Sequence, residues 1–421
     1  MNDHRAESNP RSGHPTASLY RGRSWILAAV LLVAVAPALA TATFSTAANG
    51  QYEYDSNVWD MQPGFSAFGV PEAQGSDHFY SYYGLMKASD QWSEQKISAS
   101  LSGSDYKYDR FTELNHTEYA LDAAWNWVLG QLFTGNLEFS QTQTMVQLYD
   151  IVQIQLPLAR ETRYTAGIDL LINPDWRIET TGYHRTVAES LLGEPNLRLT
   201  ETFGQASLIF GSLTGLNGGL SAGYKTGSFE GGIVAANPSY REYDYNLVAS
   251  YQKADTNAGP VAVAKGVSTF TGQVGYTDRN SATGINKYSG FTGQIDYKNQ
   301  LTFKTSVDLA LRRQTDTFII NDGSDLTSMA TLSVNWQATF KTGFIASYSL
   351  GTVDYPGQGN EPIGSERFDH VQYAILNIDY EAQTWLALRP YARLQTRRSN
   401  FDGGNYDASI IGITFSVHWQ S

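Results

Sequence analysis

The sequence predicts an all-β fold: a transmembrane, antiparallel up-and-down β-barrel of about eighteen strands, with sixteen as the alternative count. The first observation behind this prediction is the C-terminal segment. From Ile411 to Trp419, apolar side chains alternate with small or polar ones, so one face of this strand is apolar and the other is polar. Chains of outer-membrane barrels usually finish on such an aromatic-ended strand, although Gln420 and Ser421 still follow here. The alternative is a terminal edge strand of a soluble β-domain.

The second observation is a repeat of about forty residues. Short turns are expected near residues 91, 130, 174, 214, 257, 299, 340 and 383, and two alternating strands lie between successive turns. Longer polar or Gly-rich stretches divide the repeats at 61–76, 145–162, 188–199, 230–241, 316–327 and 354–369. A β-propeller also repeats at about this length, but its blades need four short strands each. The repeat therefore favours the hairpins of a barrel.

The third observation is the composition. The chain has 26 Tyr, 19 Phe, 9 Trp and 38 Gly, which suits strands, aromatic belts and tight turns. Beyond the N-terminal region, no window is apolar enough for a membrane-spanning helix. The absence of cysteine excludes disulfides and thiolate metal sites. A formal net charge of −12 argues against nucleic acid as a partner.

The N-terminal residues 1–40 have the pattern of a secretory signal peptide. Arg21 and Arg23 precede the apolar run 25–36, and Ala38-Leu39-Ala40 gives a small-x-small cleavage pattern. The run is too short to span a membrane, which disfavours a membrane anchor. We therefore expect cleavage near Ala40, a barrel formed by residues 41–421, and location in the outer membrane of a Gram-negative cell. Such a barrel would contact membrane lipid and would need the outer-membrane barrel-assembly machinery.

Tryptophan predicts which end of the barrel faces the periplasm. Six tryptophans lie beside the predicted short turns or the C-terminus, where they would form an aromatic girdle at the inner headgroup layer: Trp92, Trp127, Trp176, Trp336, Trp385 and Trp419. The short turns are therefore expected on the periplasmic side, and the longer stretches outside.

The strand parity that places apolar residues toward lipid places charged residues toward the lumen. The candidates for a solute path are Arg177, Tyr183, Arg185, Arg312, Arg389, Tyr391, Arg393, Arg397, Asp169, Asp244, Asp296 and Asp379. In one interpretation these charges form cross-strand ion pairs that keep the lumen open and rigid. In the other, the arginines from Arg389 to Arg397 attract an acidic solute, with tyrosine rings as platforms for sugars.

Enzyme signatures are scarce in this sequence. Outside the leader there are five histidines, and no pair of them has a metal-ligand spacing. We therefore expect no catalytic residues, no metal site, no cofactor and no enzymatic activity, although barrel enzymes with catalytic groups on distant strands do exist.

At Tyr54-Asp55-Ser56-Asn57-Val58 the chain resembles a family of outer-membrane β-barrels encoded with exopolysaccharide biosynthesis genes, the EpsL-like group of β-barrel porins. In that family the stretch is Tyr-Asp-Asp-Asn, so Ser56 replaces the second Asp. Further agreement comes from residues 105–111, 125–127, 174–177, 182–183 and 397–400. The resemblance implies a role in exopolysaccharide export across the outer membrane, with periplasmic polysaccharide-export components as partners. It transfers no catalytic residues.

Two alternatives to export remain open. One is a general porin-like diffusion channel, and the other is a structural or adhesive barrel that transports nothing. Polymer retained in the periplasm after gene deletion would favour export, whereas normal secretion would favour one of the alternatives.

Overall fold

A computed structural model describes residues 42–60, 62, 75–146, 158–190, 197–211, 215–231, 239–253, 268–281, 287–318, 323–355, 367–401 and 403–420. The expected signal peptide lies outside these residues. Within them, no helix is long and apolar enough to cross a membrane. The single short 3-10 turn in this part of the chain is η2, Thr112–Leu114.

The described residues form eighteen strands. They are β1 Thr43–Asp55, β2 Asp77–Trp92, β3 Gln95–Tyr108, β4 His116–Leu129, β5 Phe133–Met145, β6 Leu158–Asn173, β7 Trp176–Ser190, β8 Leu197–Gly211, β9 Leu216–Glu230, β10 Ser239–Lys253, β11 Ser268–Ser281, β12 Tyr288–Thr302, β13 Thr305–Phe318, β14 Gly323–Gln337, β15 Thr342–Tyr355, β16 Arg367–Gln383, β17 Leu386–Ser399 and β18 Tyr406–Gln420.

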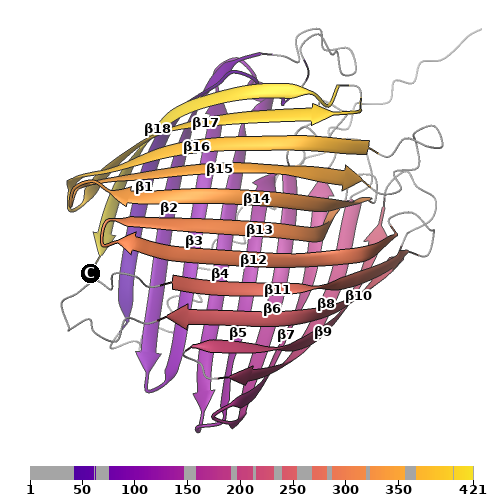
Figure 1. Cartoon of the computed structure of the whole chain (residues 1–421). Helices are drawn as coiled ribbons and strands as arrows, with labels where there is room; N and C mark the ends of the chain where they lie inside the picture. Colours follow the sequence, from indigo (N-terminus) through magenta and orange to yellow (C-terminus); the bar gives the residue numbers. More distant parts are fainter. Residues whose placement is uncertain are drawn as a thin grey trace, which may run out of the picture. The chain divides into compact units, whose positions relative to one another are not determined.

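The strands form one closed antiparallel sheet. Each strand pairs with its neighbours in the sequence, and β18 pairs with β1 from Ser45↔Gln420 to Asp55↔Ile410. Figure 1 shows the later strands crossing in front of the earlier ones at a large angle, as expected when strands tilt around a barrel. The predicted fold is confirmed, and the strand number is eighteen rather than sixteen.

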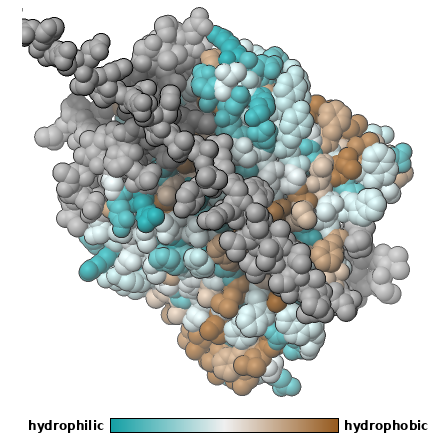
Figure 2. Space-filling model, turned by 180° about the vertical axis from the view of Figure 1, so that it is seen from behind, coloured by the Kyte–Doolittle hydropathy of each residue, from teal (hydrophilic) through white to brown (hydrophobic). Residues whose placement is uncertain are grey.

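Side chains alternate between the outside and the lumen. In β18, Ile411, Phe415 and Trp419 are exposed on the outside, whereas the intervening Ser416 is 1% exposed. The same parity holds in β9, where Leu216 and Leu220 are exposed. Figure 2 shows hydrophobic residues at the lower end and along the right side of one face, with hydrophilic residues gathered toward the top. Exposed apolar side chains on every part of the wall are expected of a barrel that faces lipid.

The barrel has one end with mostly short turns, here called the turn end, and an opposite end, the loop end. Two-residue turns lie at 93–94, 174–175, 303–304 and 384–385. The turn expected near residue 299 is four residues later, because β12 continues to Thr302. The prediction of a short turn near residue 257 is wrong, because β10 ends at Lys253 and β11 begins only at Ser268. Residues 254–267 lie outside the described part.

Several loops expected at the loop end are shorter than predicted, because the strands continue into them. The largest correction is the stretch 316–327, since β13 reaches Phe318 and β14 already begins at Gly323. Arg160 and Glu161 were likewise expected in a loop but belong to β6. Polar residues at these positions extend the strands instead of interrupting them.

A side-chain contact joins the two ends of the chain where the barrel closes. The ring of Tyr391 in β17 lies across Gly412 in β18, and a Cβ atom at position 412 would lie 2.5 Å from that ring. This passage lets the Tyr391 hydroxyl donate to the carboxylate of Glu53 in β1. Gln51 also donates to the tyrosine oxygen, at 2.7 Å. The contact, here called the seam contact, therefore spans three strands.

An aromatic cluster fills part of the loop end. The chain turns after β1 and places Trp59, which is 3% exposed, edge-on against Phe111 at 5.5 Å between ring centres. Leu114 and Tyr108 are also buried there. The carboxylate of Asp77 accepts hydrogen bonds from the backbone N–H groups of Arg110 and Phe111, which fixes the loop between β3 and β4. The interior is therefore packed at this end near β1–β4.

Candidate functional site: the barrel lumen

All twelve lumen candidates have the parity that points away from lipid. In β7, Arg177, Tyr183 and Arg185 alternate with the exposed Trp176. In β17, the candidates alternate with the exposed Leu394. The same holds for Asp169, Asp244, Asp296, Arg312 and Asp379 in their strands. Strand parity thus placed these side chains on the inner face, but it did not predict which of them solvent can reach.

A group of paired charges, here called the Glu242 cluster, lies on the inner face of β7–β11 near the loop end. Lys225 Nζ lies 2.5 Å from one Glu242 carboxylate oxygen, and Arg279 lies 3.4 Å from the other. Arg185 pairs with Glu201 at 3.0 Å. Tyr240 donates to Glu201 at 2.6 Å, and its ring lies under the Arg279 guanidinium at 3.7 Å. These contacts tie five strands together.

The ends of β13 and β14 that pair with each other at the loop end lie inside the barrel. The ladder between β12 and β13 ends at Gly293↔Arg313, whereas β13 stays paired with β14 to Phe318↔Gly323. Thr315 has the parity of the lipid-facing Leu309 and Leu311. Its hydroxyl nevertheless donates to Glu242 at 3.0 Å.

Neighbouring contacts agree with this placement. Arg279 donates to the Thr317 hydroxyl at 3.0 Å. The β14 partners of these threonines, Leu326 and Ser324, are 5% and 1% exposed. The outer-parity face of these strand ends, here called the inturned tip, is therefore packed on the inner face of β10 and β11, where it narrows the lumen.

The second group of charges lies on β15–β17 and removes Arg397 from the solute path. Arg397 is 2% exposed and donates through Nε to Asp369 at 2.9 Å and through a terminal nitrogen to the Tyr355 hydroxyl at 2.7 Å. Asp369, itself 0% exposed, also accepts from Arg367 at 3.1 Å. A side chain so enclosed is out of reach of a passing solute, so its burial favours the ion-pair interpretation of Arg397 over the guiding role.

The other two arginines of this stripe differ from Arg397. Arg389 is partly exposed and pairs with Asp379 on the adjacent strand. The interpretation of the lumen charges as cross-strand ion pairs predicts this pair. Arg393 is half-buried and lies in the field of Glu53, Asp55 and Asp60. The three arginines therefore share a face but have three different environments.

The remaining candidates have local partners. Arg177 pairs with Glu179 at 2.5 Å, Asp244 accepts from the Thr277 hydroxyl at 2.6 Å, and Asp296 accepts from Gln294 at 2.5 Å. Asp169 accepts from Thr134 at 3.4 Å. Tyr183 donates to Glu201, and Tyr391 takes part in the seam contact. Arg312 is exposed. Most of the lumen candidates therefore form an ion pair or a hydrogen bond with another residue of the wall.

Asp60 lies in the turn after β1, close to the aromatic cluster. Burial, together with the nearby charge of Asp55, raises the pKa of Asp60 to about 7, although Arg397 and Arg393 act in the opposite direction. Asp60 has a positive φ of 51°, a conformation that Asp and Asn tolerate. The carboxyl at this position therefore titrates near neutral pH.

The change Asp60→Asn is expected to remove part of the pH dependence of stability. Because the folded state holds the Asp60 proton more tightly than the unfolded state, stability is lost as the pH rises from the usual value of 3.8 to about 7. The amide has no such titration. Unfolding temperatures of both proteins, measured in detergent from pH 4 to 8, should converge at low pH and diverge as the pH rises, with the wild type lower. Parallel curves would contradict the assignment.

The lumen wall encloses several cavities. One of about 520 Å³ is lined by β6–β13, including the Glu242 cluster and the inturned tip. A second of about 350 Å³ continues toward the turn end, and the two share Gln205, Gln273 and Gln294. A third of about 380 Å³ lies on β1–β4 near the turn end, where small Ser, Thr and Ala side chains leave space.

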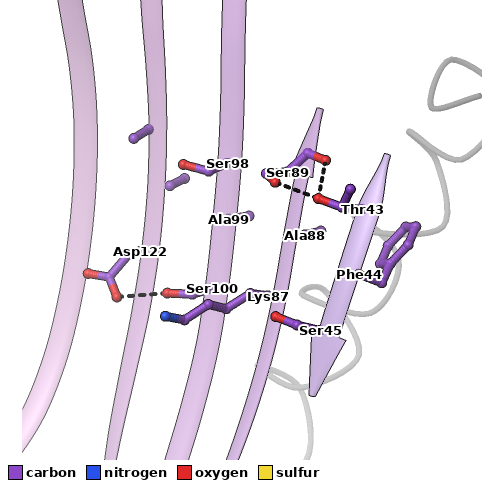
Figure 3. A pocket seen from close by; sticks show the side chains of 12 residues that line it. Thr43, Phe44, Ser45, Lys87, Ala88, Ser89, Ser98, Ala99, Ser100 and Asp122 are labelled. Atoms are coloured by element: carbon purple, nitrogen blue, oxygen red, sulfur yellow. Dashed lines mark hydrogen bonds between the residues drawn. The ribbon is translucent and has the colours of Figure 1, made fainter. Parts of the chain in front are cut away.

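Figure 3 shows this third cavity with few long side chains. Ser100 donates to Asp122 at 3.1 Å, and the hydroxyls of Thr43 and Ser89 are 2.9 Å apart. Lys87 is the cation among its lining residues. The wall is therefore recessed and polar at the turn end, in contrast to the packed loop end of the same strands.

All six tryptophans of the expected girdle lie at the turn end. Five are exposed, namely Trp92, Trp176, Trp336, Trp385 and Trp419. The sixth, Trp127, is half-buried, and its ring lies over Gly135, where an added Cβ would come within 2.3 Å. Contact of these rings with a headgroup layer stays a prediction.

Sequence reasoning did not single out Trp59, Glu242, Arg279 or the inturned tip. Glu242 and Arg279 have the inner parity that flagged other charges, so the same signal could have found them. For the tip, the available signal was the loss of apolar residues on the outer parity of β13 after Leu311. Among the described residues, no group of three or more His, Cys, Asp or Glu could hold a metal ion.

No family model matches the chain, and no curated protein matches it. Solved structures with a likeness include OccK9 (OpdG) of Pseudomonas aeruginosa, at 12% identity over 90% of this chain and 99% of that one, with a TM-score of 0.47. Others are OpdK with vanillate (9%, 89% and 99%, TM-score 0.46) and the siderophore receptor PirA (8%, 89% and 80%, TM-score 0.44), both from the same organism. Likeness at this level says nothing about what this barrel conducts. The resemblance to the exopolysaccharide group finds no support in these comparisons.

Proposed function

We propose that the protein is an outer-membrane diffusion channel of the general porin-like kind. The observation that carries this proposal is the pair of cavities of about 520 and 350 Å³ that share lining residues inside a closed barrel. Exposed apolar side chains outside and paired charges inside are the distribution that a water-filled channel in lipid needs. This proposal prefers the diffusion channel over the export role implied by the resemblance.

The proposal includes the location and orientation of the barrel. A signal peptide at residues 1–40 would direct the chain to the outer membrane, with cleavage near Ala40. The turn end would face the periplasm, since its exposed tryptophans would lie at the inner headgroup layer. Lipid and the barrel-assembly machinery are then the partners that the proposal requires.

Conductance across a planar lipid bilayer tests this function. The purified, refolded barrel is expected to insert and to give discrete, reproducible current steps, because its lumen would hold a continuous water path. Folding is checked in the same sample by the shift of the unheated band on a gel. A folded, inserted barrel that gives no current would contradict the channel and favour the structural or adhesive alternative.

Export of exopolysaccharide, including an acidic one, is a narrower proposal that rests on the Tyr54–Val58 resemblance. In the barrel, these residues extend the contact of β1 with β18: the Ser56 N–H donates to Ser409 O at 3.1 Å, and the Asn57 side-chain amide donates to Asp407 O at 3.3 Å. Such contacts support a structural use of the motif. Unchanged secretion of polymer after deletion of the gene would end the export proposal without affecting the channel.

A further inference from the structure

Three glutamines lie where the two cavities meet. Gln205 is in β8, and Gln273 and Gln294 face each other across the ladder of β11 and β12. All three line both cavities, so a solute that moves from one cavity to the other passes their amides. We propose that these glutamines form a binding site for an uncharged, hydroxyl-bearing solute such as a small oligosaccharide. This proposal rests on the proposed channel function and names its class of solute.

The amides of these glutamines keep much of their hydrogen-bonding capacity. Gln273 is exposed, and its side-chain amide makes no hydrogen bond with a residue that the structure describes. Gln205 donates only a long bond of 3.5 Å to Ser207, and Gln294 uses one N–H on Asp296. Each amide has two N–H donors and a carbonyl acceptor. The site therefore offers both donors and acceptors, as vicinal hydroxyl groups require.

The charges that line the two cavities nearly balance, with five cations and six carboxylates, and six of these groups form ion pairs with one another. Arg177 pairs with Glu179 on one side, and Arg185 pairs with Glu201 on the other. Lys225 is held by Glu242. A solute with a net charge would find no uncompensated partner in these three ion pairs, and it would also lose hydration on entering. An uncharged solute does not carry this cost.

An aromatic surface and a recess complete the site. Phe203 lines the larger cavity beside Gln205 and packs against Tyr183 with ring centres 5.2 Å apart. Rings of this kind suit the C–H faces of sugars. Gly223 in β9 lies against the Phe203 ring, where an added Cβ would be 3.1 Å away. The glycine thus gives the Phe203 ring space to lie along the wall between Gln205 and β10.

Binding can be measured with maltotriose as the uncharged probe and lactobionate as a charged probe of comparable chemistry. Maltotriose is expected to cause transient blocks of the current and to bind the detergent-solubilised barrel in titration calorimetry. The change Gln273→Leu should weaken maltotriose binding about two- to tenfold, and the triple change Gln205→Leu, Gln273→Leu, Gln294→Leu should weaken it further. The matched control is Gln395→Leu, an inner-parity glutamine in β17 outside both cavities, which should bind as the wild type does.

The outcomes separate the site from the channel. Equal maltotriose affinity in wild type and Gln273→Leu, or tighter binding of lactobionate than of maltotriose, overturns the proposed site while the channel stands. A folded barrel without current overturns the channel, and calorimetry still decides the site, because that measurement needs no conduction. Since Gln273 is exposed, its single variant is expected to fold even if the triple variant does not.

Discussion

The change Glu242→Gln is expected to destabilise the barrel by about 3–5 kcal/mol, the usual cost of breaking a buried ion pair. The Arg279 side chain is fully buried, and Glu242 is the carboxylate beside it, at 3.4 Å. Glutamine keeps the shape of the side chain but removes the charge that compensates both Arg279 and Lys225. The measurement is the temperature at which the folded band converts to the unfolded band on a gel, together with urea unfolding in detergent.

The control for this prediction is Arg312→Gln, which changes a charge on the exposed inner surface of β13. It should unfold close to the wild type, because solvent screens an exposed charge. Adding Arg279→Met to Glu242→Gln should recover part of the loss, since no uncompensated guanidinium then remains buried. If Glu242→Gln unfolds as the wild type does, the cluster does not stabilise this wall.

The change Arg397→Gln is expected to lower heat resistance and to leave ion selectivity unchanged. Its guanidinium is enclosed by Asp369 and Tyr355, so the loss leaves a buried carboxylate with one cation, Arg367, in place of two. The expected cost is again about 3 kcal/mol or more. Urea unfolding gives the stability, and the reversal potential in a salt gradient gives the selectivity.

The matched variant is Arg393→Gln, four residues earlier on the same face of β17. Its guanidinium faces Glu53, Asp55 and Asp60, so its removal makes the lumen more negative. We expect a reversal potential shifted toward cations, with a small effect on unfolding. The opposite pattern, in which Arg397→Gln changes selectivity and Arg393→Gln changes stability, would reject the assignment of the two arginines.

These two arginines show which features of the barrel the sequence can predict and which it cannot. A period of two places both on the inner face, and the repeat of about forty residues predicted about eighteen antiparallel strands. It does not predict which side chain is covered, because burial of Arg397 depends on Asp369 and Tyr355, which lie 28 and 42 residues away along the chain. Cross-strand register and depth in the barrel decide that, and both are set by the closed sheet.

The inward position of the inturned tip could not be predicted from the sequence, for a different reason. Alternation continues without a break through Thr315 and Thr317, so parity alone assigns them to the lipid face. The loop expected at 316–327 includes Thr317, whereas Thr315 directly precedes it. The structure instead keeps the strand and moves it inward, because Glu242 and Arg279 offer partners for the two hydroxyls.

The seam contact has a consequence for the order of events in assembly. Tyr391 and Glu53 are 338 residues apart, and their strands become neighbours across β18 only when the last strand pairs with the first. Hairpins that form earlier gain nothing from this hydrogen bond, so it cannot speed the early steps. It holds the finished ring against reopening, and it thereby contributes to the barrier to unfolding. Resistance to disassembly is in this way concentrated at the joint that forms last.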